Sequence, residues 1–404
     1  MKNKFLYLGI ATTVLFVGTA TVLGYISTKS HSVSTVIGAV KPSITTLPTP
    51  QGQRREETAK DSYKLLYLES DGNSSTIWSA SPDSVLATRE QVITLTHAEG
   101  YPIKASLSPK SEYLAYTLLS EGNNPAFNGS LWIMGTQGQV PKQVAMNIDY
   151  GWPPKWSNDG SYFIYIKKIP LTNAKDKYHN EIYIGSISGE TKLLFSDEES
   201  LEIVPVGWSS DGNFIYVDLI NNSGDDLYEI EHSSGASRFV AHISESAAWG
   251  LSLSPDSKTV IGSILTARDK PKYAVISVSI DNGEIKTVLD GADHHYTPIW
   301  NPIEGEITTH IPDADLQDQL MVLGVSNKQG KAKPALKNLA ELGARLPNLN
   351  KTVPVKWSPN GQWLAIEAYH GSLVNFALVH PSSGDMYFVP STDWIEFVGW
   401  VRIR

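Results

Sequence analysis

The 404-residue sequence contains no cysteine, which excludes disulfide bonds, a thiolate nucleophile and a zinc ribbon. Blocks of positive charge are lacking too: the net charge is −9, and Lys and Arg are scattered along the chain, at most two in a row. The sequence therefore lacks the electrostatic footprint of a nucleic-acid-binding protein. With 41% hydrophobic and 10% aromatic residues, it has the composition of an ordinary globular protein that needs no disulfides to fold.

Motifs of catalysis and cofactor binding are also missing. The sequence contains no G-x-S-x-G nucleophile elbow, no P-loop, no sialidase-type Asp box and no zincin motif. We therefore expect no catalytic residue, no cofactor and no resident metal, and the sequence does not indicate an enzyme.

The N-terminus has the pattern of a membrane signal. Residues 1–4 carry Lys2 and Lys4, and the uncharged residues 5–26 would span about 33 Å as a helix, against about 30 Å of bilayer hydrocarbon. We expect an uncleaved transmembrane anchor that leaves the rest of the chain outside the cytoplasm. The alternative is a signal peptide cleaved after the small-x-small triplet Gly18-Thr19-Ala20, which would give a secreted protein. Residues 27–61 are rich in Ser, Thr and Pro and predict a flexible stalk.

One short phrase recurs six times after the stalk. A β-type run follows each copy, and the Ser or Asn positions of successive copies lie 45 to 57 residues apart. This period is typical of the four-stranded blades of a β-propeller. The copies are Leu107-Ser108-Pro109, Trp156-Ser157-Asn158-Asp159-Gly160, Trp208-Ser209-Ser210-Asp211-Gly212, Leu253-Ser254-Pro255-Asp256, Trp300-Asn301-Pro302 and Trp357-Ser358-Pro359-Asn360-Gly361.

A glycine turn recurs 26 to 32 residues after each phrase, in contexts such as Asp281-Asn282-Gly283 that are typical of β-hairpins. Each unit therefore predicts four strands, of which the innermost ends at the phrase. The first unit has only three strands, and an unmatched strand, Phe397-Val398-Gly399-Trp400, stands at the other end. We predict an all-β, seven-bladed propeller over residues 62–404, closed by this C-terminal inner strand, with six blades as the alternative.

The repeats resemble those of the TolB-like propellers, which are built from WD40-like (PD40) units with the pattern W-S-P-D-G followed by an apolar strand. The best match is Trp357-Ser358-Pro359-Asn360-Gly361. The resemblance covers roughly residues 63–400 and implies the propeller fold. It says little about function, because propellers host many activities.

The loops that enter the innermost strands carry aromatic and charged residues. Because these loops converge on one face around the pore, we predict a rim that binds a protein or a glycan. The alternative is that the aromatic rings pack beneath the loops. The predicted rim consists of Tyr101, Tyr150, Trp152, Glu202, Trp249, His294, His295, Tyr296, Lys351, Trp394 and Glu396.

Three other features have ordinary structural explanations. Adjacent histidines in Asp293-His294-His295-Tyr296 would point to opposite sides of a strand, so we expect a polar loop rather than a metal site. Asp225-Asp226 and Asp313-Ala314-Asp315 are expected to be solvated turn formers rather than calcium ligands. Leucines at helical spacing in residues 334–346 predict a short amphipathic helix that packs on the propeller, with partner docking as the alternative.

These observations favour a membrane-tethered, monomeric propeller that serves as a protein- or polysaccharide-binding module of the cell envelope. The alternative function is an extracytoplasmic hydrolase or lyase, or the accessory subunit of a separately encoded hydrolase. The partner is expected to be an envelope or extracellular protein or glycan, and not a nucleic acid.

Overall fold

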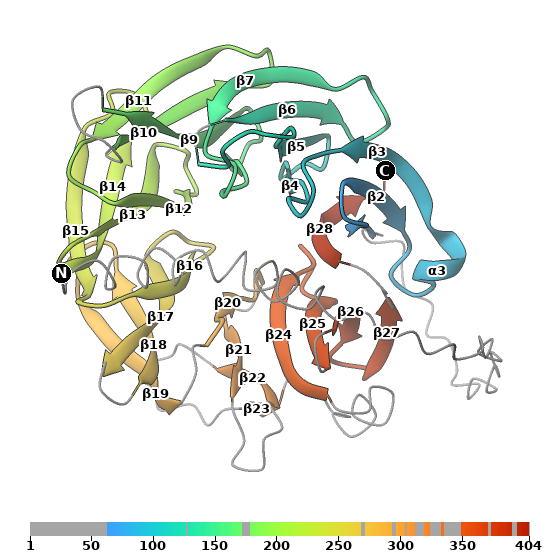
Figure 1. Ribbon diagram of the computed structural model, residues 1–404. Coiled ribbons are helices and arrows are strands. Elements are labelled where there is room, and N and C mark those ends of the chain that lie inside the picture. Colours follow the sequence, from blue (N-terminus) through green and yellow to red (C-terminus); the bar gives the residue numbers. More distant parts are fainter. Residues whose placement is uncertain are drawn as a thin grey trace, which may run out of the picture. The chain divides into compact units, whose positions relative to one another are not determined.

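The computed structural model describes residues 63–126, 128–171, 178–267, 271–292, 296–303, 305–311, 319–323, 333–334, 349–370, 373–389 and 394–403. These residues form seven four-stranded antiparallel sheets that stand around a central axis (Figure 1). The prediction of an all-β propeller is therefore confirmed.

The sheets follow one another in chain order, and we number them by that order. The first sheet is β28 (Trp394–Arg402), β1 (Tyr63–Ser70), β2 (Ser74–Ala80) and β3 (Glu90–Thr96), with the short helix α3 (Val85–Thr88) before β3. The second is β4 (Lys104–Leu107), β5 (Tyr113–Leu118), β6 (Gly129–Gly135) and β7 (Lys142–Ile148). The third is β8 (Lys155–Trp156), β9 (Tyr162–Pro170), β10 (Tyr178–Ser186) and β11 (Thr191–Asp197).

The remaining sheets repeat this order from the inside outward. The fourth is β12 (Glu202–Trp208), β13 (Phe214–Asn221), β14 (Gly224–Glu231) and β15 (Ser237–Ser244). The fifth is β16 (Ala248–Leu253), β17 (Thr259–Ala267), β18 (Lys272–Ser279) and β19 (Ile285–Ala292). The sixth is β20 (Ile299–Trp300), β21 (Ile307–Ile311), β22 (Gln319–Leu323) and β23 (Lys333–Pro334). The seventh is β24 (Leu349–Trp357), β25 (Leu364–His370), β26 (Leu373–His380) and β27 (Asp385–Val389).

The C-terminal strand closes the ring as predicted. β28 pairs antiparallel with β1, in a register that sets Trp400 opposite Leu65. Phe397 packs against Phe376 of the seventh sheet, with ring centroids 6.2 Å apart. Ser111, in the turn after β4, donates a hydrogen bond of 2.8 Å from Oγ to the carbonyl oxygen of Trp400. The last strand of the chain therefore joins the first sheet to both of its neighbours.

The recurring Trp lies where one inner strand meets the next. Trp156, Trp208 and Trp357 are buried, and Trp300 is partly buried. Three of the indoles donate to a backbone carbonyl of the preceding inner strand: Trp156 to Ser106, Trp208 to Lys155 and Trp300 to Ser252, at 3.0–3.3 Å. The ring is thus held together by polar links between inner strands as well as by hydrophobic packing.

The rest of the phrase forms a tight turn between the first and second strand of each sheet. In the third sheet the Ser157 hydroxyl donates to Asp159 at 2.6 Å and accepts the backbone N–H of Tyr162 at 3.0 Å. Gly160 follows at φ +74°, a conformation that glycine adopts without strain. The same Ser–Asp pair closes the turn at Ser209 and Asp211. The repeat is therefore a turn signature with an inner-strand Trp in front of it.

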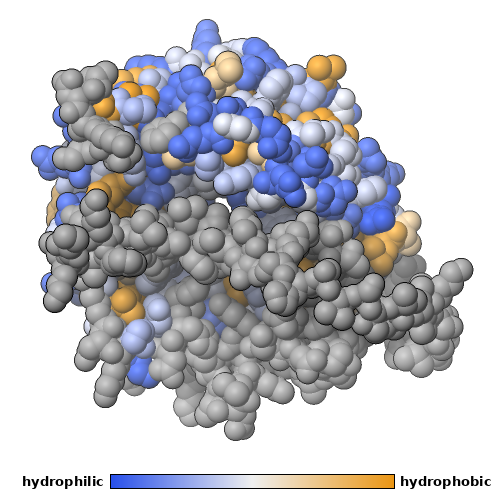
Figure 2. All heavy atoms as spheres, in the orientation of Figure 1, coloured by the Kyte–Doolittle hydropathy of each residue, from blue (hydrophilic) through white to orange (hydrophobic). Residues whose placement is uncertain are grey.

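The channel of the ring has two different ends. We call one the turn end, because it carries turns such as residues 157–161. The other is the loop end, where connections such as residues 149–154 lead from an outer strand to the next inner strand. On the described part of the face in Figure 2 the surface is mostly hydrophilic, with hydrophobic residues scattered over it.

The N-terminal predictions lie outside the described residues, as does most of the helix predicted at 334–346. Among the residues that the structure describes, no helix is both long and apolar enough to cross a membrane.

Candidate functional site

The loop end brings some of the predicted rim residues together and buries others. Tyr150 and Tyr296 are only 5% and 2% exposed. Tyr101 packs edge-on against Tyr150 with ring centroids 5.9 Å apart, and the Tyr150 hydroxyl donates to the carbonyl oxygen of Pro102. Because of this burial and packing, these rings belong to the core beneath the loops.

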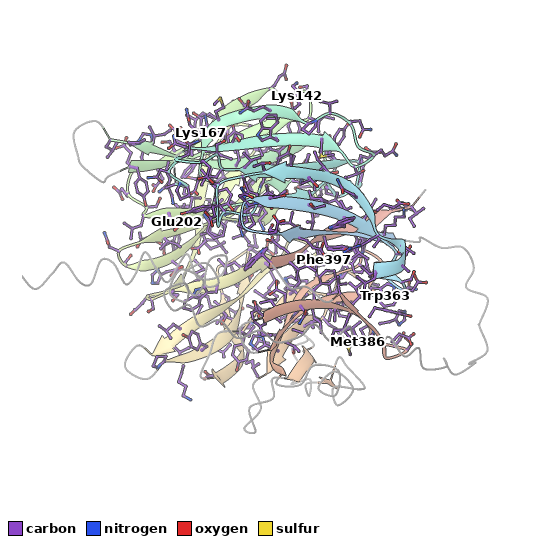
Figure 3. All side chains as sticks on the ribbon, turned by 45° about the vertical axis from the view of Figure 1, so that its right-hand side comes forward. Lys142, Lys167, Glu202, Trp363, Met386 and Phe397 are labelled. Atoms are coloured by element: carbon purple, nitrogen blue, oxygen red, sulfur yellow. The ribbon has the colours of Figure 1, made fainter. Side chains whose placement is uncertain are left out.

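Trp152 and Glu202 form the most ordered part of the predicted rim. Trp152 is partly buried, and its indole Nε1 donates to Glu202 Oε1 at 2.9 Å. Glu202 begins β12, and Figure 3 shows it at mid-height on the left of the molecule, below Lys167 and Lys142. Two loop-end residues that are 50 positions apart in sequence therefore hold each other in place.

Lys168 forms ion pairs with two carboxylates in this part of the loop end. Its ammonium lies 2.8 Å from Asp149 and 3.7 Å from Glu202, and all three side chains are largely buried. Burial alone would lower the pKa of Lys168, but the two carboxylates outweigh it and hold that pKa above its usual value. Burial raises the pKa of Glu202, and the Lys168 charge and the Trp152 hydrogen bond partly offset the rise.

A second aromatic and charged group lies between the first and second sheets. Lys104 Nζ is 3.8 Å from Glu396 Oε2 and 5.7 Å from the centre of the Trp394 ring. Trp394 is partly exposed, yet its indole nitrogen is buried without a hydrogen-bond partner in the described part of the chain. The arrangement repeats the combination of Trp, carboxylate and Lys found around Trp152.

The remaining predicted rim residues do not join these two groups in what the structure describes. Trp249 packs on Tyr273 of the same sheet, with ring centroids 5.6 Å apart. Lys351 lies in β24, but its side chain falls outside the description, and so do His294, His295 and Asp313-Ala314-Asp315. The binding role of the rim stays a prediction.

Asp225 corrects the expectation of a solvated turn carboxylate. It is only 1% exposed, and its Oδ1 accepts the backbone N–H of Ala248 at 3.2 Å. Asp226 is also drawn in: it accepts hydrogen bonds from Asn221 at 2.7 Å and from His242 at 2.7 Å. The expectation failed because β14 begins directly at Gly224, so Asp225 already points between the fourth and fifth sheets instead of into solvent.

Sequence reasoning missed the partner of Asp225. Asp218 of β13 is also 1% exposed, and the Asp225 carboxyl is the neighbour that acts most strongly on it. Asp218 Oδ1 and Asp225 Oδ2 are buried with no donor among the described residues, so a proton between the two carboxyls satisfies both. Burial, reinforced by the Asp225 charge, raises the pKa of Asp218 well above its usual range. Burial raises the pKa of Asp225 to about 6.

Neutral groups perform the equivalent task in other sheets. In the first sheet, Ser75 of β2 bonds His97 in the following loop at 2.8 Å. In the third, Asn180 of β10 donates to the carbonyl oxygen of Ser200 at 2.9 Å. A polar residue on the third strand thus holds the loop that leads to the next inner strand. Because an uncharged residue is sufficient to hold this loop, two carboxyls in the fourth sheet are not needed for that purpose alone.

The donor set does not form a metal site in the part of the chain that the structure describes. No group of three or more His, Asp or Glu side chains there is arranged to hold a metal ion. What the loop end offers is two Trp–carboxylate–Lys groups and, behind one of them, a buried acid pair.

Comparison with known proteins supports the fold alone. No family model matches the sequence, and no curated protein matches it. Prolyl oligopeptidase B from Galerina marginata is similar in structure at a TM-score of 0.55 and 13% identity, over 82% of this chain and 52% of that one. A structure from an analysis of two prolyl endopeptidases gives a TM-score of 0.58 and 12% identity, over 83% and 50%.

TolB from Acinetobacter baumannii is also similar, at a TM-score of 0.47 and 12% identity, over 84% of this chain and 66% of that one. The chain spans about half the length of the two prolyl peptidases and just under two thirds of TolB. At these identities the likeness to the two prolyl peptidases shows a shared propeller architecture.

Proposed function

We propose that the chain is a membrane-tethered, TolB-like propeller of seven blades that binds an envelope or extracellular protein or polysaccharide at its loop end. The tether is residues 5–26, and the propeller lies outside the cytoplasm. The observation that carries the proposal is the Trp152 indole, which is partly exposed and whose orientation is set by Glu202 and, through Glu202, by Lys168.

Such an arrangement is suited to recognition. An aromatic ring that is fixed before binding contributes area without losing much conformational entropy. Trp is also among the residue types most enriched in binding hot spots, and aromatic side chains commonly line ligand-binding sites. Trp394, with Lys104 and Glu396, supplies a second ring of the same kind on the same inner rim.

The test is chemical crosslinking of the full-length protein in native membranes, with the captured partner identified by mass spectrometry. A polysaccharide panel is run in parallel. The Trp152→Ala, Trp394→Ala double variant is expected to lose most of the capture while the melting temperature stays close to that of the wild type. Phe239→Ala, which removes a half-exposed ring from the outer strand β15, serves as the control and should capture normally.

Two results would contradict the binding proposal. One is undiminished capture by the double variant. The other is a double variant that no longer folds, because the rings would then be part of the core.

A hydrolase or lyase is the second candidate, and the Asp218 and Asp225 pair favours it. A carboxyl with a raised pKa is what a general acid requires. However, both side chains are 1% exposed, so a substrate would reach them only if the loop before β16 moved. Turnover of a polymer by the wild type that is abolished in Asp218→Asn would favour this function over binding. An accessory subunit would show turnover only together with its hydrolase.

A further inference from the structure

Three neighbouring sheets differ at one position of the repeat, the residue directly before the phrase. This residue is Lys155 in β8, Gly207 in β12 and Ser252 in β16. The inner strand β12 contacts both β8 and β16, so the glycine stands between the lysine and the serine. Because glycine has no side chain, the space between the two polar residues is open at the turn end.

The glycine is required neither by its backbone conformation nor by its packing. Gly207 is not among the glycines with a positive φ, the region in which glycine is favoured over other residues. A Cβ atom at this position would approach Leu253 no closer than 3.6 Å, which is an ordinary van der Waals contact. Gly399, the equivalent residue of the first sheet, differs, because a Cβ atom there would lie 3.1 Å from Leu107. A side chain therefore fits at position 207, and its absence leaves room for something else.

A cavity of about 250 Å³ occupies this space. It is lined by the ends of β8, β12 and β16 and by the turns that follow them. Trp208, Leu253 and Pro255 supply apolar surface, and Ser252 supplies a hydroxyl that makes no side-chain hydrogen bond within the described structure. Lys155 is the only charged residue among the described lining residues. The cavity therefore combines one cation and a hydroxyl group with apolar surface.

Hydrogen bonds between the sheets hold the walls of the cavity in place. The Trp208 indole donates to the carbonyl oxygen of Lys155 at 3.0 Å, which links the third and fourth sheets. The backbone N–H of Ser210 donates to the Ser257 hydroxyl at 2.6 Å, which links the fourth and fifth sheets. Because the walls are fixed in advance, a guest would bind without a large loss of conformational entropy in the protein.

The charge of Lys155 lacks a partner within the part of the chain that the structure describes. No carboxylate is among the lining residues there, whereas Lys168 and Lys104 at the loop end both form ion pairs. Burial lowers the pKa of Lys155, because nothing compensates its charge. The net charge of the protein is −9, so an uncompensated buried cation is exceptional in this chain. An anionic guest would supply the missing partner.

We propose that this cavity binds the carboxylate group of a small organic acid, with Lys155 as the cationic partner and Ser252 as a neutral donor. A single ammonium matches a monoanion, and charge-assisted hydrogen bonds to a carboxylate are stronger than neutral ones. A cavity of about 150 Å³ can hold benzene. One of about 250 Å³ therefore has room for a carboxylate on a body of that size. The site is at the opposite end of the channel from the proposed partner-binding surface and does not depend on it.

Isothermal titration calorimetry on the full-length protein at low salt tests the proposal. The probes are benzoate, its neutral analogue benzamide, and glucuronate. We expect one carboxylate per chain and binding of benzamide that is weaker by about tenfold or more, because the amide lacks the charge that pairs with Lys155. Tighter binding of benzoate would assign the site to an apolar acid, and tighter binding of glucuronate would assign it to a sugar acid. The proposal is overturned if neither carboxylate binds, or if benzamide binds as tightly as benzoate.

Two variants locate the site. Lys155→Met should weaken binding of the tighter carboxylate by about tenfold or more, because it removes the charge and keeps a side chain of similar length. Gly207→Val should also weaken it, because the added side chain fills the open space. Lys142→Met is the matched control, since Lys142 instead donates to the carbonyl oxygen of Ser188. Carboxylate binding as tight as that of the wild type in Lys155→Met would contradict the assignment.

A measurement on the unmodified protein covers the case in which a variant does not fold. The bound carboxylate should slow the reductive methylation of Lys155, followed by peptide mass spectrometry, and leave that of Lys142 unchanged. Benzamide at the same concentration should protect Lys155 less. Equal methylation rates of Lys155 with and without the carboxylate would contradict the proposal.

Discussion

The two ends of the channel treat positive charge in opposite ways. At the loop end, Lys168 lies between Asp149 and Glu202, and Lys104 lies close to Glu396. At the turn end, Lys155 and Lys356 stand without carboxylates in the described structure, and the pKa of each is lowered.

The difference comes from which segments reach each end. Loops and sheet ends supply the loop end with acidic residues such as Asp149, which directly follows β7. At the turn end, the described turns that follow the inner strands carry acidic residues that are engaged within the turns themselves. Asp159, for instance, accepts the Ser157 hydroxyl, which lowers the pKa of Asp159 to about 2. The lysines of the loop end are therefore ion-paired within the protein. The lysines of the turn end have no carboxylate partner among the described residues.

Disrupting the strand that closes the ring should destabilise the whole propeller, including both ends of the channel, and should have the largest effect on stability. Trp400 is 3% exposed and packs against Phe397, with ring centroids 5.3 Å apart. Trp400→Ala should lower the free energy of unfolding by about 3–5 kcal/mol, as measured by chemical denaturation. Trp400→Phe, which keeps a ring, should cost clearly less. An unchanged denaturation midpoint for Trp400→Ala would mean that the closing strand does not stabilise the propeller.

Removing one lysine from each end tests the comparison directly. Lys168→Met leaves Asp149 and Glu202 buried and unpaired, so it should lower the free energy of unfolding by about 3 kcal/mol or more. Lys356→Met removes a charge that has no ion-pair partner among the described residues, so it should leave stability unchanged or raise it by up to about 1 kcal/mol. Both are measured by denaturation at pH 7. Similar losses in the two variants would show that the ends do not differ in this way.

The acid pair behind the loop end should give stability a pH dependence of smaller size. The folded protein holds the proton of Asp225 up to about pH 6, whereas an unfolded Asp loses it near pH 3.8. Stability from this carboxyl is therefore present below about pH 4 and is lost as pH rises to about 6, by about 2–3 kcal/mol. The raised pKa of Asp218 extends the fall to higher pH.

Asp218→Asn should flatten this dependence and raise stability at pH 7, because the amide can donate to Asp225 without titrating. Thermal melts from pH 4 to 8 measure it. Asp281→Asn is the control, since Asp281 is an exposed carboxylate in the turn between β18 and β19. A slope in Asp218→Asn equal to that of the wild type would rule out the shared proton.

Much of the fold could be predicted because each repeat carries its own local chemistry. The Ser–Asp–Gly turn at Ser157, Asp159 and Gly160 depends on neighbouring residues, so its sequence is sufficient to identify it. Closure by residues 397–400 was predictable because an unmatched strand at one end complements a missing strand at the other. Strands that pair across more than 300 positions could be matched by counting repeats, without knowledge of their side-chain contacts.

The site was less predictable because its groups come from different sheets. Trp152 and Glu202 were identified as rim residues, but nothing in the sequence joins them to Lys168 on β9. Tyr150 and Tyr296 were assigned to the same rim and are buried, since loop position alone does not tell a ring that points outward from one that points inward. Lys155 and Lys356 could be recognised in the sequence, because each is a cation directly before the Trp of the repeated phrase. The alternation of side chains along a strand could have identified it.

The hydrogen bond from Trp208 to the carbonyl oxygen of Lys155 fixes the peptide group of a lysine whose side chain lines the cavity at the turn end. The main chain at this position is therefore held in place. The Lys155 side chain can change its rotamer by rotation of its methylene groups without breaking the indole hydrogen bond between the third and fourth sheets.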